Sequence, residues 1–340
     1  MSATFSATDR RCMRRALELA RTAFGRTSPN PCVGAVLWKK GRVIGEGYHR
    51  GAGKPHAEVE AVRDAKRRGH DPRGATIYVT LEPCSTVGRM PACTGLIVRE
   101  GIARVVAAAV DPNPLHAGGG YAVLRAAGVR VATGLMAEES NRMNRAFNHF
   151  IVTRRPWVTA KIALSLDGKI APPPGHSPWL TSEAARRTAH LLRWECDAIL
   201  VGGETARADN PRLTVRLPGK RKPQPWRIVW SRKGQLPRSL HLFSDAHRER
   251  TRVVTARAFP SVLKELGGME VTHLLLEGGG GVLTAALASG LVNEVAFFLA
   301  PQIQGSLKEA LTAALSHSLE LKEPAFERLG PDLFCRCLCG

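Results

Sequence analysis

The stretch ATIYVTLEPCSTVGRMPACTGLIVR, which spans residues 75–99, decides the fold of the first half of this chain. The run 75–80 consists mostly of β-branched and aromatic residues and predicts a strand that leads into Pro83 and Cys84. The run 93–99 predicts a helix that starts with Cys93 and stops before Gly101. Strand and helix patterns alternate in this way along the chain, which indicates α/β sheets covered on both faces.

A second motif, His56-Ala57-Glu58, stands at the start of a predicted helix over 56–68. One imidazole and two thiolates form a soft tetrahedral set that suits zinc and leaves one position open. His-x-Glu followed by Pro-Cys and a second cysteine is the signature of zinc deaminases, in which the glutamate is the general acid and base. We therefore interpret His56, Cys84 and Cys93 as zinc ligands and Glu58 as the proton shuttle.

Other interpretations of these residues weigh less. A structural zinc site is usually closed by four cysteine or histidine ligands, whereas only three candidates converge here. His49 and His70 are conceivable rival ligands. The favoured role of each is that of a hydrogen-bonded histidine that does not bind the metal. The alternating cysteines at 335, 337 and 339 share one face of a predicted terminal strand. A second metal site there is the less favoured interpretation.

The first half otherwise reads as a continuous α/β pattern. Asp9 is expected to cap a helix that extends to Phe24, and a single helix is predicted over 137–153. The remaining elements before residue 154 are strands at 33–38, 42–47, 104–110 and 129–133 and a helix at 118–127. Arg154-Arg155-Pro156 marks a boundary, because proline disfavours continuation of the preceding helix. We expect two domains, residues 1–153 and 154–340.

The second half repeats the pattern without detectable sequence repetition. Its predicted strands are 158–164, 198–201, 227–230, 251–255, 272–276 and 295–299, and its predicted helices are 182–194, 261–266 and 282–288. A glycine run from 278 to 281 lies between a strand and a helix, where backbone N–H groups and the helix dipole can hold a pyrophosphate. No Gly-x-Gly-x-x-Gly follows a first strand, so a standard Rossmann site is not indicated.

Composition places the chain among ordinary globular enzymes. Its 340 residues are 44% hydrophobic and 23% charged, and the net charge is +20. No apolar run approaches the roughly 18 residues of a membrane span, and no secretory signal is present. We therefore expect a cytoplasmic protein without a membrane partner. The positive charge is spread over both halves, so it favours phosphorylated small molecules and NADPH in general without marking a specific nucleic-acid site.

Taken together, the motifs resemble the bifunctional deaminase–reductases of riboflavin biosynthesis over nearly the whole length. In the first half the resemblance rests on residues 30–34 (NPCVG), 47–49 (GYH), 56–58 (HAE), 80–85 (TLEPCS), 88–89, 91–94 and 110–114 (VDPNP). In the second half it rests on residues 161–171 (KIALSLDGKIA), 177–182 (SPWLTS), 197–216 and 276–279 (LEGG). The eight residues between the two cysteines are typical of that family.

The resemblance implies a cytidine-deaminase-like three-layer domain followed by a dihydrofolate-reductase-like α/β domain. The first would be a zinc-dependent hydrolytic deaminase of 2,5-diamino-6-(5-phosphoribosylamino)pyrimidin-4-one, and the second an NADPH-dependent reductase of the ribosyl to the ribityl side chain. In the deaminase domain, Asn30, His49 and Arg89 would contact the substrate. Arg89 would face its phosphate, which a guanidinium grips through two hydrogen bonds.

For the reductase domain the resemblance implies three sets of residues. Lys161, hypothesised to donate a proton, and Glu277 would be catalytic. The cofactor would contact Ala163, Trp179, Thr205, Asp209, Gly279, Gly280, Gly281, Val282, Leu283, Thr284 and Ala285. The substrate would contact Ser177, Arg193, Leu213, Arg216 and Glu277. The resemblance also implies a homo-oligomer.

Two loops depart from the family pattern. Thr86 stands where the family usually has histidine, and residues 116–120 read HAGGG where it usually has VAGKG. A paralogue acting on a related pyrimidine or pteridine is therefore the first alternative. A deaminase acting on RNA, suggested by the net charge, is the second, and the reductase-like half argues against it. In a third alternative, one half has lost catalysis and remains as a scaffold.

Overall fold

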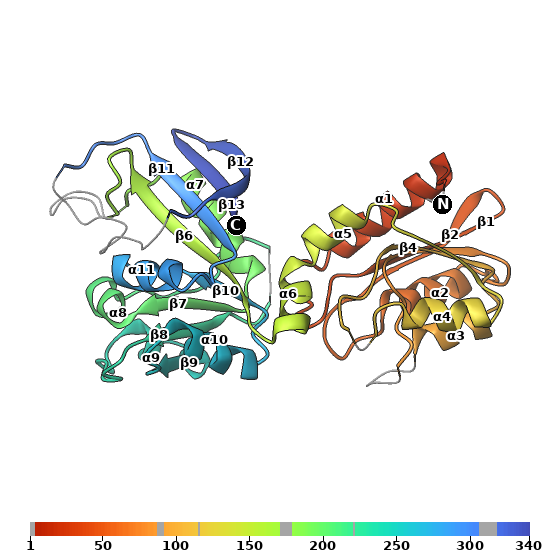
Figure 1. Ribbon diagram of the computed structural model, residues 1–340, viewed down its shortest axis with the longest axis horizontal. Helices are drawn as coiled ribbons and strands as arrows, with labels where there is room; N and C mark the ends of the chain where they lie inside the picture. Colours follow the sequence, from red (N-terminus) through yellow and green to blue (C-terminus); the bar gives the residue numbers. More distant parts are fainter. Residues whose placement is uncertain (1–3, 87–91, 115, 171–178, 220–221, 306–317) are drawn as a thin grey trace. The chain divides into compact units, whose positions relative to one another are not determined.

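The computed structural model describes residues 4–86, 92–114, 116–170, 179–219, 222–305 and 318–340. The chain divides into two compact units, Met1–Thr153 and Arg154–Gly340 (Figure 1). None of the helices in the described ranges combines the length and apolar character needed to cross a bilayer.

The first unit is built on a five-stranded sheet in the order β2-β1-β3-β4-β5. Its strands are β1 Gly34–Lys39, β2 Arg42–Tyr48, β3 Thr76–Leu81, β4 Arg104–Ala109 and β5 Arg130–Thr133. Strand β1 is antiparallel to β2 and β3, whereas β3, β4 and β5 are parallel. The carboxyl end of β3, where Pro83 and Cys84 follow, therefore lies beside that of β4.

Helices cover both faces of this sheet, because successive strand residues point to opposite sides. Leu37 and Ile77 face the helices α2 (Ala57–Arg67), α3 (Cys93–Arg99) and α4 (Gly119–Ala126). Val36 and Tyr78 face α1 (Ala7–Arg21), and α5 (Ala137–Met143) also packs on that side (Figure 1). These three layers confirm the predicted fold of the first half.

Two predictions about helix ends in this unit are wrong. The N-cap of α1 is Ser6, not Asp9; the Ser6 hydroxyl accepts from the Asp9 backbone N–H at 3.1 Å, and the Asp9 carboxylate accepts from the Ser6 backbone N–H at 2.9 Å. The helix expected over 137–153 is two helices, α5 and α6 (Arg145–Thr153). It is interrupted at Asn144, whose buried side-chain amide pairs with the N–H and C=O of Cys32 at 2.7 and 3.0 Å.

The second unit is built on an eight-stranded sheet in the order β12-β13-β11-β6-β10-β7-β8-β9. Its strands are β6 Trp157–Ser165, β7 Ala198–Gly202, β8 Trp226–Trp230, β9 Thr251–Val254, β10 His273–Leu276, β11 Glu294–Ala300, β12 Leu321–Leu329 and β13 Asp332–Cys339. The six strands from β11 to β9 are parallel, and β13 and β12 add an antiparallel edge.

Helices also cover both faces of the second sheet. The helices of the unit are α7 Glu183–Glu195, α8 Gly203–Asp209, α9 His241–Ser244, α10 Phe259–Gly268 and α11 Gly280–Ala288, with a short 3₁₀ turn at Arg248–Arg250. One core holds α10 and α11 against residues such as Val158 and Leu274, and the other holds α7 against Ile199 and Leu275. The six parallel strands end at one edge, where the glycines before α11 lie.

Candidate active sites

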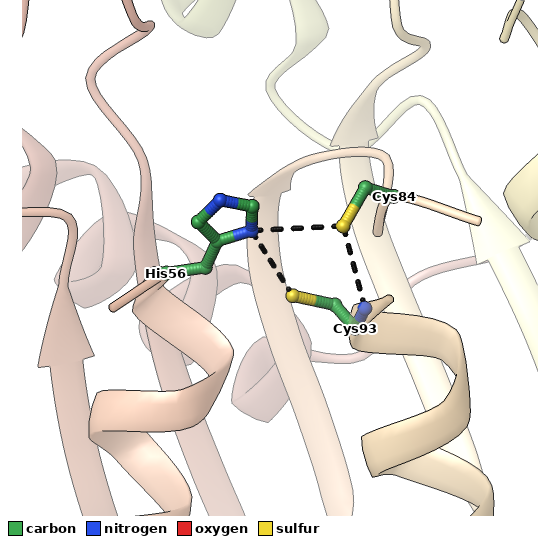
Figure 2. A group of neighbouring side chains, drawn as sticks. All are labelled: His56, Cys84 and Cys93. Carbon is green, nitrogen blue, oxygen red and sulfur yellow. Dashed lines mark hydrogen bonds between the residues drawn. The ribbon is translucent and has the colours of Figure 1, made fainter. Parts of the chain in front are cut away.

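Three residues far apart in the sequence meet beside the first sheet. His56 occupies the position just before α2, Cys84 follows β3, and Cys93 is the first residue of α3. Their ligand atoms lie within 4.8 Å of one another, with His56 Nδ1 3.3 Å from Cys93 Sγ and 3.6 Å from Cys84 Sγ (Figure 2). Zinc bonds of about 2.0–2.3 Å in a tetrahedron place neighbouring ligand atoms about 3.6 Å apart. The residues therefore fit one zinc ion.

The two thiols influence each other's ionisation. The hydrogen bond with Cys93, together with that of His56, lowers the pKa of Cys84 to about 4. The same hydrogen bond with Cys84, together with burial, raises the pKa of Cys93. The Cys93 backbone N–H also donates to Cys84 Sγ at 3.3 Å. One sulfur of the pair is thus held as a thiolate, the form that binds metal.

Glu58 lies in the first turn of α2, beside this group. Its side chain is buried and hydrogen-bonds to Cys93. Burial and the neighbouring Cys84 raise the pKa of the carboxyl, while His56 acts in the opposite direction. Among the described residues the metal-binding group contains His56, Cys84 and Cys93 but not Glu58. A carboxyl group in this position can exchange protons with a molecule bound at the open corner.

Two of the substrate residues predicted from the resemblance pair with each other next to His56. Asn30 Nδ2 lies 3.0 Å from His49 Nε2, and His49 Nδ1 lies 3.0 Å from the carbonyl oxygen of Pro55. Because a carbonyl only accepts, the proton of His49 is on Nδ1 and Nε2 accepts from Asn30. The His49 and His56 rings meet edge to face at 5.6 Å. Neither His49 nor His70 belongs to the described metal group, and Arg89 lies outside the described residues.

The second unit holds a cavity of about 1180 Å³ at the carboxyl ends of its parallel strands. Ligands of open α/β sheets bind at this edge. Predicted site residues that line the cavity are Lys161, Ala163, Thr205, Asp209, Glu277, Gly279, Gly280, Gly281, Val282, Leu283 and Ala285. Trp179 and Thr284 are not among the described lining residues, and Ser177 lies outside the described part of the chain.

A buried ion pair stands at the floor of this region. Both carboxylate oxygens of Glu277 accept from Arg193, at 2.5 and 2.8 Å, and the side chains are only 8% and 14% exposed, respectively. Burial alone would raise the pKa of Glu277, but the attraction of Arg193, with Lys161, lowers it to about 2. Burial lowers the pKa of Lys161, and Glu277 opposes that effect.

The remaining predicted substrate residues connect to the same ion pair. Arg193 Nη1 donates to the Thr214 carbonyl at 3.0 Å, which fixes the segment that contains Leu213 and Arg216. Arg216 Nη1 donates to the Thr214 hydroxyl at 3.1 Å. The structure thus brings Arg193, Leu213, Arg216 and Glu277 into one neighbourhood.

Sequence reasoning missed a group of residues that line the cavity beyond β7, β8 and β9. These are Gly202, Gly203, Arg207, Ser231, Arg232, Lys233 and Arg257. Most of them lie at or shortly after the carboxyl end of a parallel strand, whereas Arg207 lies in α8. The basic members matter for cofactor choice, because four positive side chains stand at one end of the cavity.

Comparisons with known proteins cover both units. The family model "RibD C-terminal domain" matches residues 156–335, and "Cytidine and deoxycytidylate deaminase zinc-binding region" matches residues 6–109. The riboflavin biosynthesis protein RibD of Aquifex aeolicus is 40% identical over 96% of this chain and 97% of its own length. The RibD protein of Escherichia coli K12 is 36% identical over 96% and 98%.

Solved structures show the same similarity in three dimensions. Acinetobacter baumannii RibD superposes with a TM-score of 0.89 at 33% identity, covering 98% of this chain and 99% of that one. The crystal structure of a diaminohydroxyphosphoribosylaminopyrimidine deaminase/5-amino-6-(5-phosphoribosylamino)uracil reductase from Thermotoga maritima gives 0.88 at 34% identity, with the same coverage. A match over both halves leaves the RNA-directed alternative without support.

Proposed function

The chain belongs to the RibD family and is a bifunctional deaminase and reductase of riboflavin biosynthesis, and from this premise we propose which of its residues carry the two reactions. Residues 1–153 form the zinc-dependent deaminase domain, and residues 154–340 form the NADPH-dependent reductase domain. The deaminase acts on the diaminopyrimidinone ribosyl phosphate, and the reductase converts the ribosyl group of its product to ribityl. The two activities in the name of the Thermotoga protein support this order.

In the deaminase, His56, through Nδ1, and the sulfurs of Cys84 and Cys93 would hold zinc, which lowers the pKa of a bound water when present. Glu58 takes a proton from the attacking water and delivers it to the departing amino group. Water adds to the amino-bearing carbon, the carbon–nitrogen bond breaks, and ammonia leaves, so no proton is gained or lost overall. His49, held by Pro55, orients the Asn30 amide toward its role as a substrate contact.

In the reductase, NADPH would supply the hydride. The N-terminus of α11, with Gly279 as its N-cap, offers backbone N–H groups to the pyrophosphate. The Thr205 hydroxyl accepts from the Gly279 N–H at 3.1 Å and so fixes the start of this turn. A Cβ at Gly278 would lie 2.7 Å from the Val282 side chain, so the packing of the turn on the helix requires glycine there.

A basic cluster supports NADPH over NADH. Arg207, Arg232, Lys233 and Arg257 line the same cavity, and all four are exposed. Guanidinium groups bind phosphate through paired hydrogen bonds, and lysine adds a point charge. We assign this cluster to the 2′-phosphate, which distinguishes NADPH from NADH.

Lys161 and Glu277 carry the proton chemistry of the reduction in this proposal. The hydride would form a new bond to sugar C1 while the bond from C1 to the ring oxygen breaks. The ring oxygen takes a proton from Lys161, whose lowered pKa makes it a better acid near neutral pH. Glu277, kept ionised by Arg193, accepts hydrogen bonds from the sugar hydroxyls.

Two further features of the protein belong to the proposal. None of the eight cysteines forms a disulfide, which supports a cytoplasmic location with its reducing conditions. A homo-oligomer is proposed by family resemblance.

The observation that carries the proposal is the convergence of His56, Cys84 and Cys93 around one point. The test combines metal analysis of the purified protein with assays of both steps. We expect one zinc per chain, ammonia release from the diaminopyrimidinone phosphate, and NADPH oxidation with the deaminated product. Zinc without ammonia release from this substrate would favour the paralogue that acts on a related pyrimidine or pteridine.

A further inference from the structure

Glu82, the residue after β3, has an unusual set of partners for a buried carboxylate. Its Oε2 accepts from the backbone N–H groups of Asp111 at 3.1 Å and Gly118 at 3.0 Å. Its Oε1 accepts from those of Gly120 at 2.8 Å and Tyr121 at 3.3 Å. The residue is 6% exposed. One side chain thus supports four backbone donors of a loop that lies far along the chain.

These donors include the N-terminal N–H groups of α4, which have no partner inside the helix. The N-cap of α4 is Gly118, in a left-handed conformation with φ of 77°, and it has no side chain with which to cap. Glu82, at the end of β3, supplies the acceptor that Gly118 lacks. A carboxylate at a helix N-terminus is also favoured by the helix dipole. Glu82 therefore links the start of α4 to the end of β3.

The same loop packs directly on the segment that contains Cys84. A Cβ on Gly120 would lie 2.1 Å from the carbonyl oxygen of Pro83, and a Cβ on Gly119 would lie 3.4 Å from the Ser85 hydroxyl. Burial raises the pKa of the Asp111 carboxyl, and the nearby Glu82 and Cys84 add to that effect. Asp111 and the N-terminal residues of α4 thus lie beside the segment that carries Cys84.

We propose that Glu82 is a positioning residue for deamination: it fastens Asp111 and the start of α4 against the segment 83–85, and so shapes the side of the substrate site next to the metal. This inference rests on the proposed deaminase function. Glu82 touches neither the zinc ligand atoms nor the reacting atoms, and it acts through the backbone groups it holds. Its effect is therefore on substrate affinity rather than on metal binding.

The test uses the full-length Glu82→Gln variant, because an amide presents N–H groups to donors that need an acceptor. Losing one hydrogen bond to a charged group predicts a fall of about 10- to 100-fold in kcat/KM for ammonia release. We expect most of this fall in KM. The zinc content and the NADPH-dependent reductase activity of the same chain should stay at wild-type levels, and the latter reports on folding.

Two further variants separate positioning from a general loss of stability. Asp64→Asn changes another nearly buried carboxylate of the same unit, one that accepts from the Glu46 backbone N–H at 3.0 Å, away from the loop. Its KM should not change even if the unit becomes less stable. Gly120→Ala pushes the loop off Pro83 with Glu82 intact and should raise KM as Glu82→Gln does.

Several results would overturn the inference. They are an unchanged KM in Glu82→Gln, an equal rise of KM in Asp64→Asn, or a loss of zinc with kcat reduced and KM constant. If Glu82→Gln does not fold, an unchanged KM in Gly120→Ala overturns it equally. Failure of the proposed function would look different, because the wild-type protein itself would then release no ammonia.

Discussion

Replacing Arg193 by methionine removes the partner of the buried Glu277 and tests the electrostatic design of the reductase site. The pKa of Glu277 is about 2, against an ordinary value of 4.5, because the attraction of Arg193 outweighs the burial that would raise it. That difference corresponds to about 3 kcal/mol of stability. The side chains are only 8% and 14% exposed, so solvent does not screen the interaction strongly. Breaking a buried pair typically costs about 3–5 kcal/mol.

The sign of the pH dependence follows from the direction of the shift. A carboxyl with a lowered folded pKa stabilises the protein above its unfolded pKa, and this contribution fades as the pH falls from about 4.5 toward 2. Without Arg193, burial raises the pKa of Glu277, so the carboxyl of the variant becomes neutral at a higher pH. The stability difference between wild type and Arg193→Met should therefore be largest near pH 7 and shrink toward pH 4.

Urea unfolding followed by tryptophan fluorescence measures this difference in stability. Five of the six tryptophans lie in the second unit and only Trp38 lies in the first, so the signal reports mainly on the unit that contains Arg193. Arg248→Met is the matched control, since Arg248 pairs with Glu249 on the surface, at 61% and 86% exposure. The free energy of unfolding of this control should differ little from that of the wild type at pH 7 and at pH 4. The reasoning is refuted if Arg193→Met is as stable as this control at pH 7, or if its deficit grows on acidification.

Three other predictions concern separate parts of the molecule. Glu58→Gln should keep its zinc and its reductase activity while ammonia release falls by a factor of about 10² or more, as for loss of a general acid–base group; undiminished release would remove Glu58 from the mechanism. Replacing both Arg232 and Lys233 by serine should raise the KM for NADPH at least about tenfold and leave that for NADH nearly unchanged, since only NADPH has the extra phosphate; an equal effect on both cofactors in steady-state kinetics would contradict this assignment. Gly34→Ala places a Cβ 2.0 Å from the Ala16 carbonyl oxygen. Because overpacked cores lose about 1–3 kcal/mol of stability, the midpoint temperature of thermal unfolding of the first unit should fall by several degrees. An unchanged midpoint would mean that α1 moves away at no cost.

Sequence patterns predicted most of the elements because these are buried and their periodicity is strong. The apolar runs of β3, β7 and β10 are bounded by glycine, proline or charged residues, so their limits were readable. Strand β12 was not predicted, because its residues are nearly all exposed and its middle carries no apolar alternation. Its place in the sheet comes from pairing with β13, a tertiary contact that leaves no local pattern.

Helix ends depended on side-chain hydrogen bonds, one local and one distant. Asp9 looked like a cap because aspartate is common there, but Ser6 in front of it forms the capping box. Asn144 interrupts the predicted helix over 137–153 by bonding to Cys32, more than a hundred residues earlier. Neither partner could be found by periodicity alone.

The candidate sites divide in the same way. The metal group was predictable, because residue types and spacing encode ligand chemistry directly. The resemblance implied that Arg193 and Glu277 both contact the substrate, but their pairing with each other required the fold. The basic residues Arg232, Lys233 and Arg257 were not predicted, because only the parallel strands bring them to one cavity.

X-ray absorption at the zinc edge of the purified protein tests the metal centre most directly. We expect one zinc per chain with two sulfur neighbours at about 2.3 Å, one imidazole nitrogen at about 2.0–2.1 Å and one further light atom from solvent. Cys84→Ser should lower the sulfur count to one. A zinc ion bound by four protein side chains, or two sulfurs that persist in Cys84→Ser, would contradict an open catalytic site formed by His56, Cys84 and Cys93.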